Sequence, residues 1–176
     1  CVMNGKLDNL SLYKDSHISY APDDSGVSIG AGLLTYYKFT NKNRIPYEIK
    51  QNYFGPSYSN QEIQRELKTF KLNYSIKKNI AKFTAELISK GFLIGWFQGR
   101  MEFGHRALGN RSILADPRKV YFKDMVNKAV KFRESFRPFA PAVIDQDVNK
   151  IFEIPKNRKV YFMERAYKIK KEWRKK

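Results

Sequence analysis

The chain has 176 residues, of which 42% are apolar and 15% aromatic, and its formal net charge is +17. The length suffices for one well-cored domain with a small appendage, and the basic excess predicts an anionic partner such as a phosphate-bearing small molecule, RNA or an acidic protein surface. No apolar run is long enough to span a bilayer, no secretory leader is evident, and the single cysteine excludes an internal disulfide framework. We therefore expect a cytoplasmic protein without a membrane partner.

The first part of the chain predicts a short strand over residues 17–20 and a helix over residues 27–39. The small residues 30–32 of that helix allow close packing, which we expect against the turn that precedes it. Asp24 lies in this turn and could either cap the helix or ligate a metal ion, and its residue chemistry alone favours the cap. Residues 40–58 are polar and interrupted by prolines and glycine, which predicts a linker.

The remainder predicts a mixture of helices and strands. Ser59 and Glu62 have the spacing of a capping box, which predicts a helix over residues 60–69. Apolar residues at helical spacing predict a second helix over residues 76–88, ended by Gly91. Further expected elements are strands at 92–97 and 110–114, a helix at 120–130, a buried run at 139–144, a short helix ending near Phe152 and a strand within 160–169. The fold class we expect is α/β or α+β.

Residues 98–112, QGRMEFGHRALGNRS, interleave three glycines with three arginines. Glycine lets the backbone approach a ligand closely, and the arginine fork matches phosphate oxygens. The segment lacks the signature of a Walker A loop and the glycine spacing of a dinucleotide-binding loop. A solvated surface turn is the alternative to an anion site. The candidate anion-binding residues are Arg100, Gly104, His105, Arg106, Gly109, Asn110, Arg111 and Ser112.

A second basic segment contains Lys131, Arg133 and Arg137 and stands before another apolar run. Both segments could converge on one pocket that neutralises a triphosphate and stabilises the charge that shifts during phosphoryl or nucleotidyl transfer. We expect Glu102 and Glu134 to orient guanidinium groups through ion pairs rather than to act as general bases. His105 could donate to a phosphate or shuttle a proton, but a local hydrogen-bonding role is the more common one for a lone histidine.

Two long motifs, GWFQGRMEFGHRALGNRSILADPR and VNKAVKFRESFRPFAPAVI, resemble the C-terminal region of the O-carbamoyltransferase family, which includes nodulation-factor and antibiotic carbamoyltransferases. The stretch ISYAPDDSGVSIGAGLLTYY resembles the end of that family's N-terminal domain. The resemblance implies three parts. Residues 1–39 would be a remnant of an actin/hexokinase-like ATPase domain, residues 40–58 a linker, and residues 59–176 a truncated YrdC-like domain with an open twisted sheet and flanking helices.

The resemblance also implies the chemistry. The YrdC-like domain would use carbamoyl phosphate and ATP, with Mg²⁺ on the nucleotide, to form carbamoyl-adenylate. The N-terminal domain would pass the carbamoyl group to a hydroxyl acceptor with the help of a divalent metal of the Fe or Mn type. Matching the motifs residue by residue implies catalytic roles for Arg106, Arg111 and Lys131, and a metal-ligand role for Asp24 in a full-length protein.

Three departures accompany this resemblance. Asp23 stands where the family usually has glycine, and His105 stands where it usually has proline. The chain also stops before the family's His-Val-Asp-Gly-x-x-Arg segment, so we expect a fragment. The alternative function is a nucleic-acid-binding module, since the net charge is high and aromatics such as Tyr53, Phe54 and Trp96 could stack on bases.

Overall fold

The computed structural model describes residues 1–10, 13, 16–44, 49–155 and 158–174, so residues 45–48 of the expected linker lie outside the described residues. The chain forms two compact units. Unit 1 comprises residues 1–53, 103–106 and 142–176, and unit 2 comprises residues 54–102 and 107–141. The expected division into residues 1–39, 40–58 and 59–176 stays a prediction.

Unit 2 begins with two helices whose ends follow local rules. Helix α3 spans Asn60–Thr69, and its capping box is confirmed, because Ser59 Oγ accepts from the Glu62 N–H at 3.2 Å and Glu62 Oε2 accepts from the Ser59 N–H at 2.7 Å. Helix α4 spans Ile80–Ser89 and starts later than expected, because Asn79 caps it. Gly91, with φ of +95°, follows its end as the left-handed residue that the sequence predicts.

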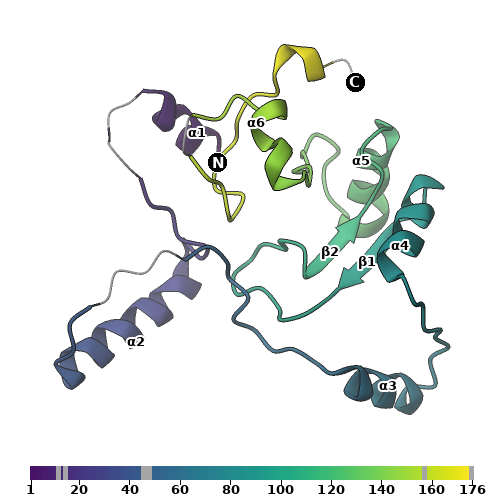
Figure 1. Ribbon diagram of the computed structural model, residues 1–176, viewed down its shortest axis with the longest axis horizontal. Helices are drawn as coiled ribbons and strands as arrows, with labels where there is room; N and C mark the ends of the chain where they lie inside the picture. The colour runs from purple at the N-terminus through teal and green to yellow at the C-terminus, as the bar shows by residue number, and fades with distance from the viewer. Residues whose placement is uncertain (11–12, 14–15, 45–48, 156–157, 175–176) are drawn as a thin grey trace. The chain divides into compact units, whose positions relative to one another are not determined.

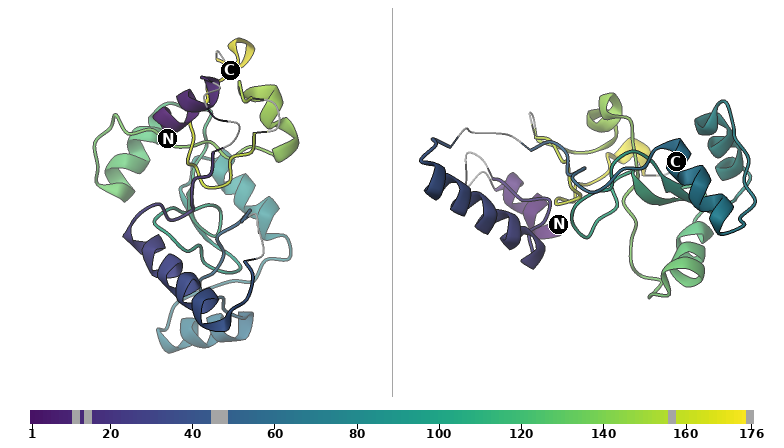
Figure 2. Two further views of the ribbon diagram at one scale, coloured as in Figure 1. Left: turned by 90° about the vertical axis from the view of Figure 1, so that its left-hand side faces the viewer. Right: turned by 90° about the horizontal axis from the view of Figure 1, so that it is seen from below.

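The sheet of unit 2 has two antiparallel strands, β1 at Ile94–Phe97 and β2 at Arg111–Leu114. Ile94 lies opposite Leu114, and Phe97 lies opposite Arg111. Helix α4 runs beside β1, as the three views agree (Figures 1 and 2). Both strands fall within the expected ranges, and the glycine–arginine segment forms the connection between them.

The second half of unit 2 contains an uncommon helix. Helix α5 spans Tyr121–Met125 and continues directly into a π-helix, η1, at Val126–Lys131. Phe122 and Val126 are buried on it and supply apolar core. The π-helix ends at Phe132, which has a left-handed backbone with φ of 48°. π-Helices are rare and frequently occur at functional sites, so this turn is a candidate for a functional role.

Unit 1 joins the two ends of the chain. Its helices are α1 at Val2–Asn9, α2 at Asp24–Thr40 and α6 at Val148–Ile151, with 3₁₀ turns η2 at Asp145–Asp147 and η3 at Lys171–Trp173. The Ala166 N–H donates to the Cys1 carbonyl at 3.2 Å. Asp8 on α1 pairs with Arg165 at 2.9 Å and with Arg158 at 3.3 Å, and all three side chains are largely buried.

Helix α2 corrects two expectations. It begins three residues early, and its N-cap is Asp23, whose carboxylate accepts from the Ser25 N–H at 3.2 Å, so the expectation that Asp24 is the cap was wrong. Asp24 is instead the first helical residue. Close packing against the preceding turn occurs at Gly26, where a Cβ would come within 2.0 Å of the Ala21 carbonyl oxygen, and not at residues 30–32.

Three expected extended segments also differ. Residues 17–20 and 160–169 form no strand, apart from one bridge between Phe152 and Ile169. Met163 has a left-handed backbone that interrupts an extended run. Residues 139–144 are exposed rather than buried, and Pro141 removes a backbone donor that a strand would need.

The protein is thus a mixed α and β structure with a small two-stranded sheet in the described residues, which confirms the α+β expectation at that level. Among the described helices, none combines the length and apolar character that a membrane crossing requires.

Candidate functional site

The glycine–arginine connection folds around the carboxylate of Glu102, whose side chain has no exposed surface. Glu102 Oε1 accepts from the N–H groups of Leu108 at 2.7 Å and Asn110 at 2.8 Å, and Oε2 accepts from Arg111 Nε at 2.9 Å. The segment therefore already surrounds an anion, and that anion belongs to the chain. The ion pair that the sequence predicts for Glu102 is confirmed.

These contacts set the protonation state of the carboxylate. Burial by itself raises the pKa of Glu102, but the hydrogen bonds from Arg111, Asn110 and Leu108 outweigh it and lower the pKa to about 2. Glu102 is thus ionised near neutral pH. An ionised carboxylate that accepts three hydrogen bonds holds the loop, and a general-base role for it would require breaking those bonds.

Other predicted residues of this segment also make contacts within unit 2. Arg100 donates from Nε to the Gly55 carbonyl at 3.0 Å and from Nη2 to the Phe54 carbonyl at 3.2 Å. Asn110 Nδ2 donates to the Arg100 carbonyl at 2.6 Å, and Ser112 Oγ accepts from the Gly109 N–H at 3.0 Å. The arginine and the amide thereby brace the connection, and their assignment to ligand binding stays a prediction.

Residues 103–106 of the same segment belong to unit 1. Gly104 has φ of +107°, and a Cβ there would lie 3.0 Å from the Tyr20 carbonyl oxygen. His105 Nδ1 lies 3.2 Å from a carboxylate oxygen of Asp23, which is a local contact of the kind expected for a lone histidine. Arg106 Nη2 lies 3.9 Å from Cys1 Sγ. The binding or catalytic roles of these residues stay predictions.

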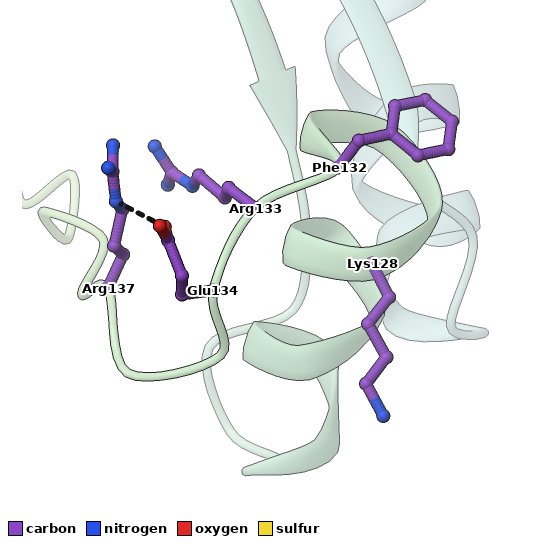
Figure 3. A pocket seen from close by; sticks show the side chains of 5 residues that line it. All are labelled: Lys128, Phe132, Arg133, Glu134 and Arg137. Carbon is purple, nitrogen blue, oxygen red and sulfur yellow. Dashed lines mark ion pairs between the residues drawn. The ribbon is translucent and has the colours of Figure 1, made fainter.

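A cationic pocket of about 550 Å³ lies in unit 2 where the π-helix ends (Figure 3). It is lined by Lys128, Phe132, Arg133, Glu134 and Arg137. Glu134 pairs with Arg137 at 2.9 Å, which confirms the second predicted ion pair. The lining thus combines three cationic side chains with one carboxylate, and this carboxylate is already paired.

The aromatic neighbour of the pocket restrains one of its arginines. The guanidinium carbon of Arg133 lies 4.6 Å from the centre of the Phe139 ring, which is within the range of a cation–π contact. This contact leaves the edge of the planar group able to donate hydrogen bonds. Arg133 and Arg137 can therefore present N–H groups to an anion from the same loop, as Figure 3 illustrates.

The structure thus brings together two of the predicted basic residues, Arg133 and Arg137. Lys131 is the last residue of η1 and is exposed, but it does not line the pocket. Two lining residues, Lys128 and Phe132, were not predicted. Lys128 stands three residues before Lys131, but the π-helical turn that sets the side-chain directions was not visible in the sequence.

A resident metal site does not fit the described residues. They contain no group of three or more His, Cys, Asp or Glu side chains that could hold an ion. Asp24 is exposed at the start of α2, and the residue beside it, Asp23, is occupied by Ser25 and His105. The described residues by themselves therefore do not form a metal site.

The described residues form an α+β fold that carries a cationic pocket open to solvent. Residues 85–176 match the family model for the carbamoyltransferase C-terminus. The chain belongs to this carbamoyltransferase family, as the sequence motifs indicate.

Similar proteins support the same family. The chain is 41% identical over 165 residues to nodulation protein NolNO of Sinorhizobium fredii. This alignment covers 92% of this chain and 24% of that protein. It is 38% identical to nodulation protein NolO of Bradyrhizobium diazoefficiens, over 97% of this chain and 32% of that protein. It is 29% identical to the 3'-hydroxymethylcephem-O-carbamoyltransferase of Streptomyces clavuligerus, over 86% of this chain and 27% of that protein. The chain therefore spans only 24% to 32% of the length of these relatives.

Proposed function

We propose that this chain is the part of an O-carbamoyltransferase that binds carbamoyl phosphate and ATP and forms carbamoyl-adenylate. The acceptor in the whole protein is a hydroxyl group of a sugar or natural product. Membership of the family supports the carbamoyl chemistry, and one relative is named for O-carbamoyl transfer. The observation that supports the phosphate-binding role most strongly is the pocket lined by Lys128, Arg133 and Arg137.

The charge of the pocket suits these two substrates. Both carry phosphate groups, and an arginine can donate two parallel hydrogen bonds to phosphate oxygens. Arg133 and Arg137 are therefore the cations best placed for phosphate, because Lys128 lines the pocket but points away from them in Figure 3, and Glu134 is held by Arg137. As bonds to phosphorus break, negative charge grows on the departing phosphate or pyrophosphate, and fixed cations stabilise that charge.

The proposed reaction balances with one water molecule. Water attacks the phosphorus of carbamoyl phosphate and the bond from that phosphorus to the carbamoyl oxygen breaks, which gives phosphate and carbamate. A carbamate oxygen then attacks the α-phosphorus of ATP. The bond between the α- and β-phosphates breaks, and pyrophosphate and phosphate are released. In this scheme the pocket residues bind and orient phosphate groups, and Mg²⁺ arrives with the nucleotide.

The motif match supports roles for four further residues. We propose candidate catalytic roles for Arg106, Arg111 and Lys131, and we propose that Asp24 is a metal ligand in a longer protein. We also propose a YrdC-like relationship for residues 59–176 and an actin/hexokinase-like origin for residues 1–39. The fold of the described residues supports only the α+β class.

Calorimetric titration tests the binding role. ATP with Mg²⁺, carbamoyl phosphate and pyrophosphate are titrated separately into the wild-type chain and into Arg133→Ala and Arg137→Ala. Loss of one charged hydrogen bond is expected to weaken binding by roughly tenfold to a hundredfold. The matched control is Arg65→Ala, because Arg65 lies on α3, is 71% exposed and does not line the pocket. A folded wild-type chain that binds none of the three ligands would contradict the proposal.

The same variants separate this proposal from nucleic-acid binding. An RNA site that depends on the overall charge responds to Arg65→Ala about as strongly as to Arg133→Ala, and its affinity falls steeply with salt. A pocket for a small phosphate ligand responds only to the lining residues. Equal losses with RNA, together with no response to ATP or carbamoyl phosphate, would favour the nucleic-acid function.

A further inference from the structure

Asn127 is a completely buried polar residue on the π-helix, with 0% of its surface exposed. Burying an amide without hydrogen-bond partners is unfavourable, so a buried amide is expected to be hydrogen-bonded. The partners of the Asn127 side chain therefore indicate its structural role. The neighbouring residue Val126 is also buried, but it is apolar. Asn127 is therefore a polar side chain on the buried side of η1.

The side chain of Asn127 makes its hydrogen bonds with the pocket loop. Its Oδ1 accepts from Arg133 Nε at 2.7 Å. Its Nδ2 donates to the Arg137 carbonyl at 3.1 Å and, more weakly, to the Ser135 carbonyl at 3.4 Å. The amide thus contacts the loop at the two arginine positions that line the pocket and at a residue between them.

The backbone of Asn127 holds the same loop. Its carbonyl accepts from the Arg133 N–H at 3.0 Å and also from the N–H of Phe132, where the π-helix ends. Phe132 has the left-handed backbone that a bulky side chain rarely adopts, and such a conformation persists only when its surroundings enforce it. The bonds to Asn127 supply part of that enforcement.

We infer that Asn127 is a positioning residue for the cationic pocket, and that it acts mainly by fixing the guanidinium of Arg133. The bond to Nε and the Phe139 ring on the face of the guanidinium hold Arg133 from two sides. The terminal N–H groups remain to meet a phosphate. This inference rests on the proposed function, because it is for phosphate ligands that the direction of Arg133 matters.

Two measurements on the full chain test this inference. The first needs no ligand: the Arg133 Nε–H resonance, assigned by its loss in Arg133→Lys, is followed by NMR. It is expected to be slow to exchange in the wild type and to lose this protection in Asn127→Ala. The second is ATP affinity in a double-mutant cycle of Asn127→Ala and Arg133→Lys, with the urea midpoint of each variant measured alongside.

If Asn127 acts through Arg133, Asn127→Ala weakens ATP binding by roughly tenfold in the wild-type background and by less than about twofold in the Arg133→Lys background. Equal losses in both backgrounds, with a lower urea midpoint, would show a merely structural role and overturn the inference. If Asn127→Ala does not fold, Asn127→Asp replaces it and keeps the acceptor oxygen. The protected Nε–H signal is then expected to persist, and its disappearance would contradict the inference.

Failure of the two proposals can be distinguished. A wild-type chain that shows the protected Nε–H signal but binds neither ATP nor carbamoyl phosphate rejects the proposed function and leaves the link between Asn127 and Arg133 supported. A chain that binds ATP but shows no protected signal rejects the positioning role alone.

Discussion

Glu102 and Arg111 form an ion pair in which Arg111 Nε lies 2.9 Å from Glu102 Oε2, and the carboxylate side has no exposed surface. Two backbone N–H groups point at the other carboxylate oxygen. The pair closes the connection between β1 and β2, so the segment richest in glycine and arginine is organised around an internal charge.

Removing this charge is expected to be costly. Glu102→Ala leaves the partly buried Arg111 and two backbone donors without their acceptor, and we expect a loss of about 2–4 kcal/mol in the free energy of unfolding. Urea unfolding followed by circular dichroism measures it. Glu134→Gln is the matched control, because the Glu134–Arg137 pair is about half exposed and its loss is expected to cost less than about 1 kcal/mol. Similar effects of the two variants would contradict this account of the loop.

The same residue predicts a pH dependence. The pKa of Glu102 is about 2 in the folded chain against an ordinary value of 4.5, so the unfolded chain binds the proton more readily. Its stabilising contribution is therefore complete above pH 4.5 and is lost as the pH falls towards 2.

Comparison with Glu102→Gln isolates this contribution from that of Asp116, whose pKa is also lowered to about 2 by its bonds to Arg118. We expect the wild type to exceed the variant in stability by up to about 3 kcal/mol at neutral pH and the difference to shrink at pH 3. A difference that is constant between these pH values would show that the carboxylate is not ionised as described.

Two glycines provide a matched pair for backbone strain. Gly104 and Gly109 have φ of +107° and +112°, but only Gly104 faces a close neighbour, the Tyr20 carbonyl oxygen, which would lie 3.0 Å from an added Cβ. We expect Gly109→Ala to cost about 1–2 kcal/mol from the left-handed backbone alone, and Gly104→Ala to cost about 1 kcal/mol more. Thermal or urea unfolding distinguishes them, and a larger cost for Gly109→Ala would be inconsistent with this packing.

The corrected helix cap can be checked directly. Asp23→Ala removes the acceptor for the Ser25 N–H and the contact with His105, and we expect a loss of about 1 kcal/mol. Asp24→Ala removes only a negative charge in the first turn of α2, and we expect it to lower the free energy of unfolding by at most about 0.3–1 kcal/mol. If Asp24→Ala proves the more destabilising of the two, the assignment of Asp23 as the cap is wrong.

Local signals in the sequence predicted much of unit 2. The capping box of Ser59 and Glu62 placed the start of α3, and Gly91 placed the end of α4, because both rules depend on residues close in the chain. Strand predictions succeeded at 94–97 and 111–114, which pair with each other. The strand expected within 160–169 did not form, and the run at 139–144 that was expected to be buried is exposed, because an apolar run does not specify which partner will cover it.

The candidate site was predicted less completely for a related reason. Arginines and glycines indicated an anion site, but their spacing could not show that Glu102 occupies Arg111 and nearby backbone donors. The importance of Asn127 depends on a π-helical turn, whose residues do not follow the period of 3.6 used to place helical faces.

Chemical protection shows most directly which arginines a phosphate ligand covers. The chain is treated with phenylglyoxal in the presence and absence of ATP with Mg²⁺, and modification at each arginine is measured by mass spectrometry. ATP is expected to protect Arg133 and Arg137, while Arg65 is expected to react equally in both samples. Unchanged reaction at Arg133 and Arg137, with protection elsewhere or nowhere, would contradict the claim that their pocket binds the substrate phosphates.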